Sequence, residues 1–135
     1  MAWTTPKTNW VEDDFINASD INRIVGNIAY LKDLASHLFA GTFSYTPVET
    51  KAVLYDFYAD EINAIENNLA NLNGHTLQYY IGETATYNPN GAWVDAVELN
   101  RLESGTLRLY TEMTIRHSNL DRLSFTLGGE RKFKI

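Results

Sequence analysis

The sequence contains no cysteine and no long hydrophobic run, and each absence excludes a class of protein. Without cysteine, disulfides, thiolate metal ligands and a cysteine nucleophile are all excluded. No stretch approaches the ~20 apolar residues that cross a bilayer, and the N-terminus lacks the apolar run of a signal peptide. We therefore expect a soluble protein that is made in the cytoplasm, does not insert into a membrane, and is stabilised by packing alone.

Basic residues are also in short supply, with 11 Lys and Arg against 17 Asp and Glu and a net charge of -6. Phosphate recognition depends on clustered Lys and Arg, and the one basic cluster is the C-terminal Arg131-Lys132-Phe133-Lys134. We expect no nucleic-acid partner. A length of 135 residues suits a single domain with one core.

Patterns that carry catalysis are missing as well. The histidines His37, His75 and His117 have no partner three or four residues away, so no helical or zinc-finger metal motif is present. Acid pairs such as Asp13-Asp14 are adjacent in sequence and do not face each other as glycosidase carboxylates do. No phosphate-binding glycine loop or nucleophile elbow occurs. We predict a protein that is not an enzyme and has no cofactor or metal.

What is present is a phrase of seven residues that occurs three times: alanine, any residue, an acid, an aliphatic, asparagine, any residue, an aliphatic. The copies are Ala18 to Ile24, Ala59 to Ile65 and Ala96 to Leu102. An aromatic precedes each copy, Phe15 and Trp93 six positions before the first aliphatic and Phe57 five before. A period of about forty residues indicates repeated architecture, and a repeated helical phrase favours packing or docking over an active site.

Apolar spacing predicts three helices. The first starts near Asn17, where Asp20 completes a capping box, and stops by Gly41. The second runs from about Val48 to Leu72, either as one helix or as two pieces that meet near Ala59. The third runs from Trp93 or Asp95 to Ser104 or somewhat beyond, and Gly105 weakens it.

The remaining segments indicate a minor β component. Residues 77–81 are typical of a short strand, and residues 113–115 of extended chain. Residues 123–127 and 130–135 alternate on either side of Gly128-Gly129, which predicts a hairpin. The predicted fold is mainly α, with three repeat-bearing helices in a small bundle and a C-terminal β-hairpin. It forms one domain, 1–135, with an irregular aromatic lead-in (1–17), a helical core (18–110) and a β-rich tail (111–135).

The asparagine of each phrase lies at the border of the apolar stripe, where its amide can donate to and accept from the segment just before the helix. Arg23 and Arg101 fall in first turns, where the helix dipole disfavours cations, so each needs a carboxylate. We expect Asp13 or Asp14 beside Arg23, and Asp95 or Glu98 beside Arg101.

Two interpretations of these side chains stay open. Either they fix loops to helices, or they face a neighbouring protein; likewise the tryptophans of the lead-in cover either the helices or a partner's groove, with core packing favoured. The candidate partner-binding residues are Trp3, Trp10, Asn22, Arg23, Asn100, Arg101 and Phe133.

Aromatic residues also gather around the turn-rich segment 75–93, at Tyr79, Tyr80, Tyr87 and Trp93. Flat aromatic rings beside amides are typical of saccharide-binding surfaces, and they equally close the end of a helical bundle. We favour packing and keep carbohydrate binding as the alternative role of these four residues.

The stretch from Trp10 to Leu31, with its acidic run, Ala18 and Ile21-Asn22-Arg23-Ile24, resembles a phrase of tail, baseplate and fibre-associated structural proteins of phages and prophages of Gram-positive bacteria. Residues 92–105 are similar to it again, and residues 62–69 are a partial version. The chain departs from the pattern where Ala64 replaces the arginine, and it lacks the long repetitive shaft of a full fibre.

The resemblance implies a non-enzymatic virion structural or adaptor protein that is synthesised in the host cytoplasm. Its partners would be other virion proteins of the tail, baseplate or fibre attachment. Repeated copies around a symmetric ring, including copies of this chain as a homo-oligomer, would add up modest contacts. The alternative function is a receptor- or carbohydrate-binding module that uses exposed Tyr and Trp.

Overall fold

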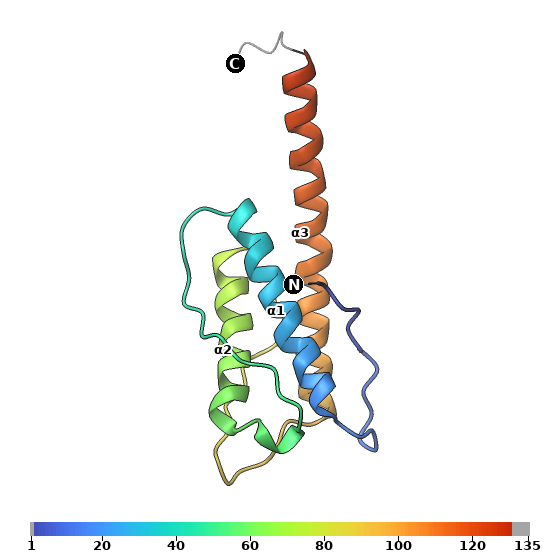
Figure 1. The fold of residues 1–135 in the computed structure, drawn as a ribbon, viewed down its shortest axis with the longest axis vertical. Coiled ribbons are helices and arrows are strands. Elements are labelled where there is room, and N and C mark those ends of the chain that lie inside the picture. Colours follow the sequence, from blue (N-terminus) through green and yellow to red (C-terminus); the bar gives the residue numbers. More distant parts are fainter. Residues whose placement is uncertain (1, 131–135) are drawn as a thin grey trace.

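Three α-helices lie side by side and run in the same direction (Figure 1). The computed structural model describes the backbone of residues 2–130 and the side chains of residues 2–120. The helices are α1 (Ala18–Leu38), α2 (Ala59–His75) and α3 (Ala96–Glu130), and a short 3₁₀ helix, η1 (Leu54–Asp56), precedes α2. Each α-helix packs against both of the others. The prediction of a mainly helical bundle is confirmed.

Because the helices are parallel, the chain must return along the outside of the bundle before each new helix. Figure 1 shows these irregular segments descending beside the helices. We call them strap 1 (residues 2–17), strap 2 (residues 39–58, with η1) and strap 3 (residues 76–95). Each strap ends at a helix N-terminus, so all three helix starts lie at the same end of the bundle.

The core is formed by an apolar stripe on each helix. The stripe of α1 is buried at Ile21, Ile24, Ile28 and Leu31, and α2 contributes Ile62, Ile65, Leu69 and Leu72. The stripe of α3 is buried at Leu99, Leu102, Thr106, Leu109 and Met113. These last positions are spaced 3, 4, 3 and 4 apart, the heptad spacing of a coiled-coil seam.

The predicted start of α1 is confirmed. Asn17 is the N-cap, and its backbone N–H donates to Oδ2 of Asp20 at 2.8 Å, as in a capping box. For α2, the two-piece alternative is closer to the structure than one helix from Val48. Residues 48–53 are irregular, and the helical structure is interrupted between η1 and Ala59. Side chains of the helices bond backbone groups of strap 2, so these groups are satisfied without helical hydrogen bonds.

The predicted end of the third helix is wrong, because α3 passes through Gly105 and continues to Glu130. A Cβ at Gly105 would lie 3.3 Å from Leu69 and 3.4 Å from Ile81, so the glycine lets α3 approach α2 and strap 3 closely. Close packing offsets the weak helix propensity of glycine. Although α3 is long, no helix in the described residues is apolar enough over sufficient length to cross a membrane.

The predicted β elements are not found. Residues 113–115 and 123–127 belong to α3, and residues 77–81 form irregular chain, so residues 2–130 contain no strand. The predicted hairpin and the β-rich tail 111–135 are therefore wrong over 111–130, while residues 131–135 lie outside the described residues. The alternation at Leu123, Phe125 and Leu127 resembles a strand pattern, but Leu120, Leu123 and Leu127 also fit the heptad spacing of the helix.

Candidate functional site

The three copies of the phrase begin the three helices. Ala18, Ala59 and Ala96 are the first residues of α1, α2 and α3. The acid of the phrase caps its helix in two copies, since Asp20 and Glu61 accept the backbone N–H groups of the N-cap residues. In α3 the direction is reversed, and Asp95 accepts the N–H of Glu98 at 2.9 Å. The copies therefore share one conformation, the start of a helix.

Two of the three aromatics that precede the copies are not buried. Phe15 and Trp93 are exposed, and the residues that the straps bury lie five positions before the first aliphatic: Phe57 and Val94 are in the core and Ile16 packs against it. Phe15 and Trp93 therefore resemble each other as exposed aromatic residues and not as core residues. The repeated buried position is apolar without being always aromatic.

Each asparagine of the phrase clamps a strap by two hydrogen bonds to a single residue. Oδ1 of Asn100 accepts the Trp10 N–H at 2.8 Å, and Nδ2 donates to the Trp10 carbonyl at 3.0 Å. Asn63 bonds Tyr87 in the same way at 2.7 and 2.8 Å, and Asn22 bonds Lys51 at 2.9 and 2.7 Å. These pairs satisfy backbone groups that a strap without neighbouring strands would otherwise leave to water.

The expectation that each asparagine holds its own lead-in segment is wrong. Asn22 of α1 holds strap 2, Asn63 of α2 holds strap 3, and Asn100 of α3 holds strap 1. The clamps therefore pass around the bundle in a closed cycle. This cyclic order gives one chain a pseudo-threefold axis parallel to its helices.

A second set of clamps, which sequence reasoning missed, joins α1 and α2 to their own straps. Asn27, five residues after Asn22, pairs with Thr4 of strap 1, and Asn68, five after Asn63, pairs with Thr46 of strap 2. In α3 the equivalent position is Gly105, against which Ile81 of strap 3 packs. The signal was the second asparagine at a fixed distance from the first.

Two arginines of the phrase form ion pairs across helix interfaces. Nε of Arg23 lies 2.7 Å from Oε1 of Glu103, and Nη2 lies 2.8 Å from Oε2. Glu103 is fully buried and also accepts the Lys7 N–H at 3.0 Å and the Trp10 indole N–H at 2.6 Å. Hydrogen bonding to Glu103 is the main cause of a raised pKa for Arg23. Neither Asp13 nor Asp14 is its partner; the second carboxylate is Asp20, at 3.0 Å.

Arg101 makes the corresponding pair with Glu66 of α2 and also bonds Glu98, as expected. Burial opposes the charge of Arg101, but its bonds to Glu66 and Glu98 raise its pKa. Burial raises the pKa of Glu66 above its ordinary value although Arg101 acts in the opposite direction. Strap 3 passes close here at Gly82, whose φ is +90° and where a Cβ would overlap the Arg101 side chain.

At the third interface both charged positions are apolar. In the two ion pairs, the arginine lies one residue after the motif asparagine of its helix, and the glutamate lies three residues after that of its own helix. At the α2–α1 interface these positions hold Ala64, one residue after Asn63, and Val25, three residues after Asn22. Glu61, which thereby lacks a cation in its own phrase, pairs with Lys51 of strap 2 at 3.1 Å. The loss of both charges together avoids a lone buried ion.

These contacts engage most of the predicted partner-binding residues within the chain. Trp10 is buried beside Glu103, and Trp3 stacks on Tyr110 with ring centroids 3.9 Å apart. The motif side chains Asn22, Arg23, Asn100 and Arg101 hold straps and helices together. Phe133 lies outside the described residues. The structure thus gives the first six an internal role, and their contact with a partner stays a prediction.

The four aromatic candidates for carbohydrate binding are spread along strap 3. Asn73 clamps Tyr79 near the C-terminal end of α2, whereas Trp93 precedes the start of α3 at the other end. The Tyr87 hydroxyl is buried, and burial and then the charge of Glu66 raise its pKa. Tyr80 is the most exposed large apolar residue of strap 3, at 78%. The four rings therefore do not form one continuous aromatic surface on the strap.

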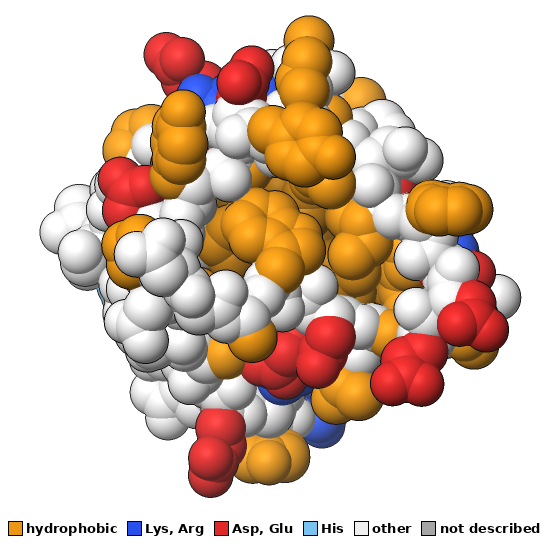
Figure 2. Space-filling view, turned by 90° about the horizontal axis from the view of Figure 1, so that it is seen from below, with side chains coloured by type: hydrophobic (Ala, Val, Ile, Leu, Met, Phe, Trp, Pro, Cys, Tyr) orange, Lys and Arg blue, Asp and Glu red, His pale blue; other side chains and the backbone are white. Residues whose placement is uncertain are grey.

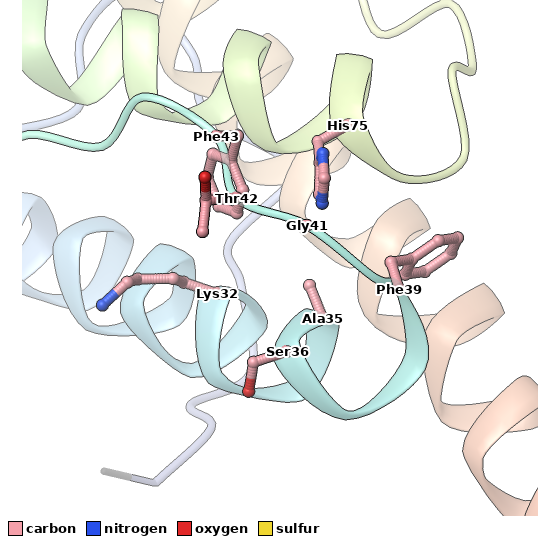
Figure 3. A pocket seen from close by; sticks show the side chains of 8 residues that line it. All are labelled: Lys32, Ala35, Ser36, Phe39, Gly41, Thr42, Phe43 and His75. Atoms are coloured by element: carbon pink, nitrogen blue, oxygen red, sulfur yellow. The ribbon is translucent and has the colours of Figure 1, made fainter.

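Several hollows mark the described surface, among them a wide, open one of about 530 Å³ beside Tyr45, Pro47 and Val48. One of about 170 Å³ lies where α1 and α2 end, between Phe39, Phe43 and His75 (Figure 3). Its volume is below the usual range for small-molecule sites, ~300–1,000 Å³. A hollow of about 270 Å³ lies beside His37 and His117, whose ring centroids are 6.5 Å apart. Among the described residues, no three His, Cys, Asp or Glu side chains group as metal ligands would.

The helix-start end carries most of the exposed large apolar side chains (Figure 2). Phe15 is 90% exposed and Val97 72%. The other exposed members come from all three straps: Val11, Val53, Tyr55, Tyr58 and Trp93. Exposed acids flank them at Glu12, Asp13, Asp56, Asp60 and Asp95. We call this surface, with its apolar residues and acidic surround, the start face.

Comparison with protein-family models, with curated proteins and with solved structures finds nothing that matches this chain.

Proposed function

We propose that this protein is a non-enzymatic structural or adaptor component of a phage or prophage virion. It docks on symmetric partners in the tail, baseplate or fibre attachment. The observation that carries the proposal is the pseudo-threefold bundle, in which one chain repeats its helix starts and strap clamps around an axis and presents the start face at one end.

The repeat supports a scaffold role because its polar groups are used for internal joints. Asn22, Asn63 and Asn100 each bond one strap residue, and the buried carboxylates of Glu66 and Glu103 face arginines. Such side chains fix a shape and leave few polar groups to converge on a substrate. The proposal accordingly includes no catalytic residue, cofactor or metal.

The start face supports docking. Soluble monomers rarely expose large contiguous apolar patches, and those that occur often mark interaction sites. Phe15, Tyr55 and Trp93 lie on three different straps, close to the helix starts, so a partner on the bundle axis would meet a side chain from each. A threefold-symmetric partner fits this arrangement best.

Charge indicates the chemistry of that partner. The start face combines apolar rings with exposed acids such as Asp13, Asp60 and Asp95. A second start face would bring like charges together, which costs free energy. The partner surface should therefore present apolar side chains among Lys and Arg.

Particle composition tests the proposal. Virions released by the strain that encodes the chain would be purified on a density gradient and analysed by quantitative mass spectrometry. We expect the chain to co-migrate with tail proteins, with one copy for every three copies of the protein that forms its threefold partner. Abundant chain in the lysate together with none in intact particles would contradict the virion role.

Variants test the docking surface separately. Phe15→Ser and Trp93→Ser, supplied to a deletion mutant, should reduce incorporation into particles at least about tenfold if each ring adds more than ~1.4 kcal/mol. Tyr80→Ser is the matched control, because Tyr80 is similarly exposed but lies outside the start face. Equal incorporation of all three variants would place docking elsewhere on the molecule.

A second candidate function is receptor or carbohydrate binding. It is favoured by the exposed Tyr80 ring beside a polar hollow of about 120 Å³ that is also lined by Tyr79, Asn73 and Arg101. Specific signals on a glycan array that disappear with Tyr80→Ala would support it. An array without signal, or binding that Tyr80→Ala leaves intact, would count against it.

A further inference from the structure

Beyond the proposed function, we propose that the projecting part of α3, residues 118–130, is a self-association surface on which a second copy of this chain docks by coiled-coil packing. The observation is the continuation of the buried seam of α3 beyond the end of the bundle. This inference depends on the seam alone and not on a virion role.

The bundle ends well before α3 does. His37, in the last turn of α1, lies beside His117, and the Arg116 guanidinium lies 5.8 Å from the ring of Phe39. Past this level α3 stands without α1 or α2 beside it (Figure 1). Residues 118–130 form about 20 Å of helix at ~1.5 Å per residue.

The seam keeps its register across this boundary. Inside the bundle it consists of Leu99, Leu102, Thr106, Leu109 and Met113, all buried. Continued at the same alternation of three and four, the positions are Arg116, Leu120, Leu123 and Leu127. Three of the four positions after Arg116 are therefore leucine, at 120, 123 and 127, and the fourth is Glu130. Leu120, the first of these leucines, is 47% exposed in the single chain.

An uncovered helix of this composition is marginal in water. The segment continues a helix that is already formed, so it needs no new nucleus, but it includes Ser118, Asn119, Ser124 and the glycines 128–129, which have weak helix propensity. Burial of a leucine side chain contributes about 1.5–3 kcal/mol. A second copy that covers the three leucines would therefore stabilise the segment.

The charges of the segment favour a second copy as the occupant. Residues 118–130 contain Asp121 and Glu130 against Arg122, so two copies repel each other little compared with the acidic start face. The positions that flank the seam, where like charges would oppose pairing, hold His117, Asn119, Ser124 and Thr126 and carry no acid. Pairing along this seam therefore does not require a partner of opposite charge.

Sedimentation equilibrium of the full chain tests the proposal. We expect the weight-average mass to rise with concentration from the chain mass of 15.3 kDa to at least double that value. Leu120→Lys, which places a charge on the seam, should weaken association at least about tenfold. Ile115→Lys is the matched control, because Ile115 is 52% exposed on the same helix but lies off the seam; it should associate like the unaltered chain.

Hydrogen exchange by mass spectrometry supplies a second measurement that does not depend on mass. Amides of residues 118–127 should become more protected as concentration rises in the unaltered chain and in Ile115→Lys, and not in Leu120→Lys. Unchanged protection of α1 amides would show that Leu120→Lys is folded. A chain that remains at 15.3 kDa over the whole concentration range, or equal association of the two lysine variants, would overturn the proposal.

Discussion

Glu103 of α3 and Arg23 of α1 form a two-point ion pair, with N–O distances of 2.7 and 2.8 Å, in which the carboxylate has no solvent exposure. The same carboxylate accepts hydrogen bonds from the backbone of Lys7 and the indole of Trp10. One side chain thus connects α1, α3 and strap 1. Its removal should affect all three.

We predict that Glu103→Ala lowers the free energy of unfolding by about 3 kcal/mol, because it leaves the partly buried Arg23 with only Asp20 and removes the acceptor of the Trp10 indole. Urea unfolding followed by circular dichroism measures the change. Glu112→Ala is the control, since Glu112 lies on the same helix and is only half-buried. A loss for Glu103→Ala no larger than that of the control would mean that the pair contributes little.

The second ion pair allows a test of the pseudo-symmetry. The chain itself replaces arginine and glutamate by Ala64 and Val25 at the third interface. We predict that Arg101→Ala combined with Glu66→Val is less destabilising than the sum of the single changes by at least about 1 kcal/mol, because neither charge is then left alone. A double-mutant cycle in urea gives the coupling energy. Additive single effects would show that the two positions are not coupled as the cyclic order requires.

The clamp asparagines should be sensitive to loss of their amide donor. In Asn100→Asp, a carboxylate oxygen would replace Nδ2 and face the Trp10 carbonyl, which now accepts at 3.0 Å. We expect a loss of about 1–3 kcal/mol, the cost of leaving a polar pair unsatisfied. Asn90→Asp makes the same chemical change at an exposed residue of strap 3 and should be nearly neutral. Thermal unfolding of both variants decides whether the clamp or the added charge matters.

The sequence was sufficient for the helix starts because their signals are local. Asn17 and Asp20 cap α1 within one turn, and the aliphatics of each phrase fall on one helix face. The two-point bonding of the asparagines also follows from the amide group itself. Which strap each amide holds does not follow, because Asn100 and Trp10 meet only when three parallel helices close the cycle.

The buried acids and the length of α3 were harder to predict. Glu66 and Glu103 lie on the apolar faces of their helices, three residues after the motif asparagine, and the repeat at that position includes Val25. If the comparison of the three repeats had been extended by one helical turn, it would have shown that arginine and glutamate are replaced together, by Ala64 and Val25. For α3, the strand-like alternation of Leu123 to Leu127 and the nearby glycines competed with a heptad spacing, and helical continuity from the packed part of α3 prevailed.

The pH dependence of stability supplies the last prediction. Burial raises the pKa of Glu66 in the folded protein above its ordinary value of 4.5. The folded state then binds more protons at this site than the unfolded chain, so the site's contribution to stability is present below pH 4.5 and is lost as pH rises through the folded pKa.

Glu66→Gln removes this titration and keeps the shape of the side chain. The free energy of unfolding of the unaltered chain minus that of Glu66→Gln should therefore fall between pH 4 and pH 7, whatever the other groups do in common. Urea unfolding of both proteins across that range measures the difference. A difference that rises with pH would mean that Arg101 outweighs burial and lowers the pKa of Glu66 in the folded protein.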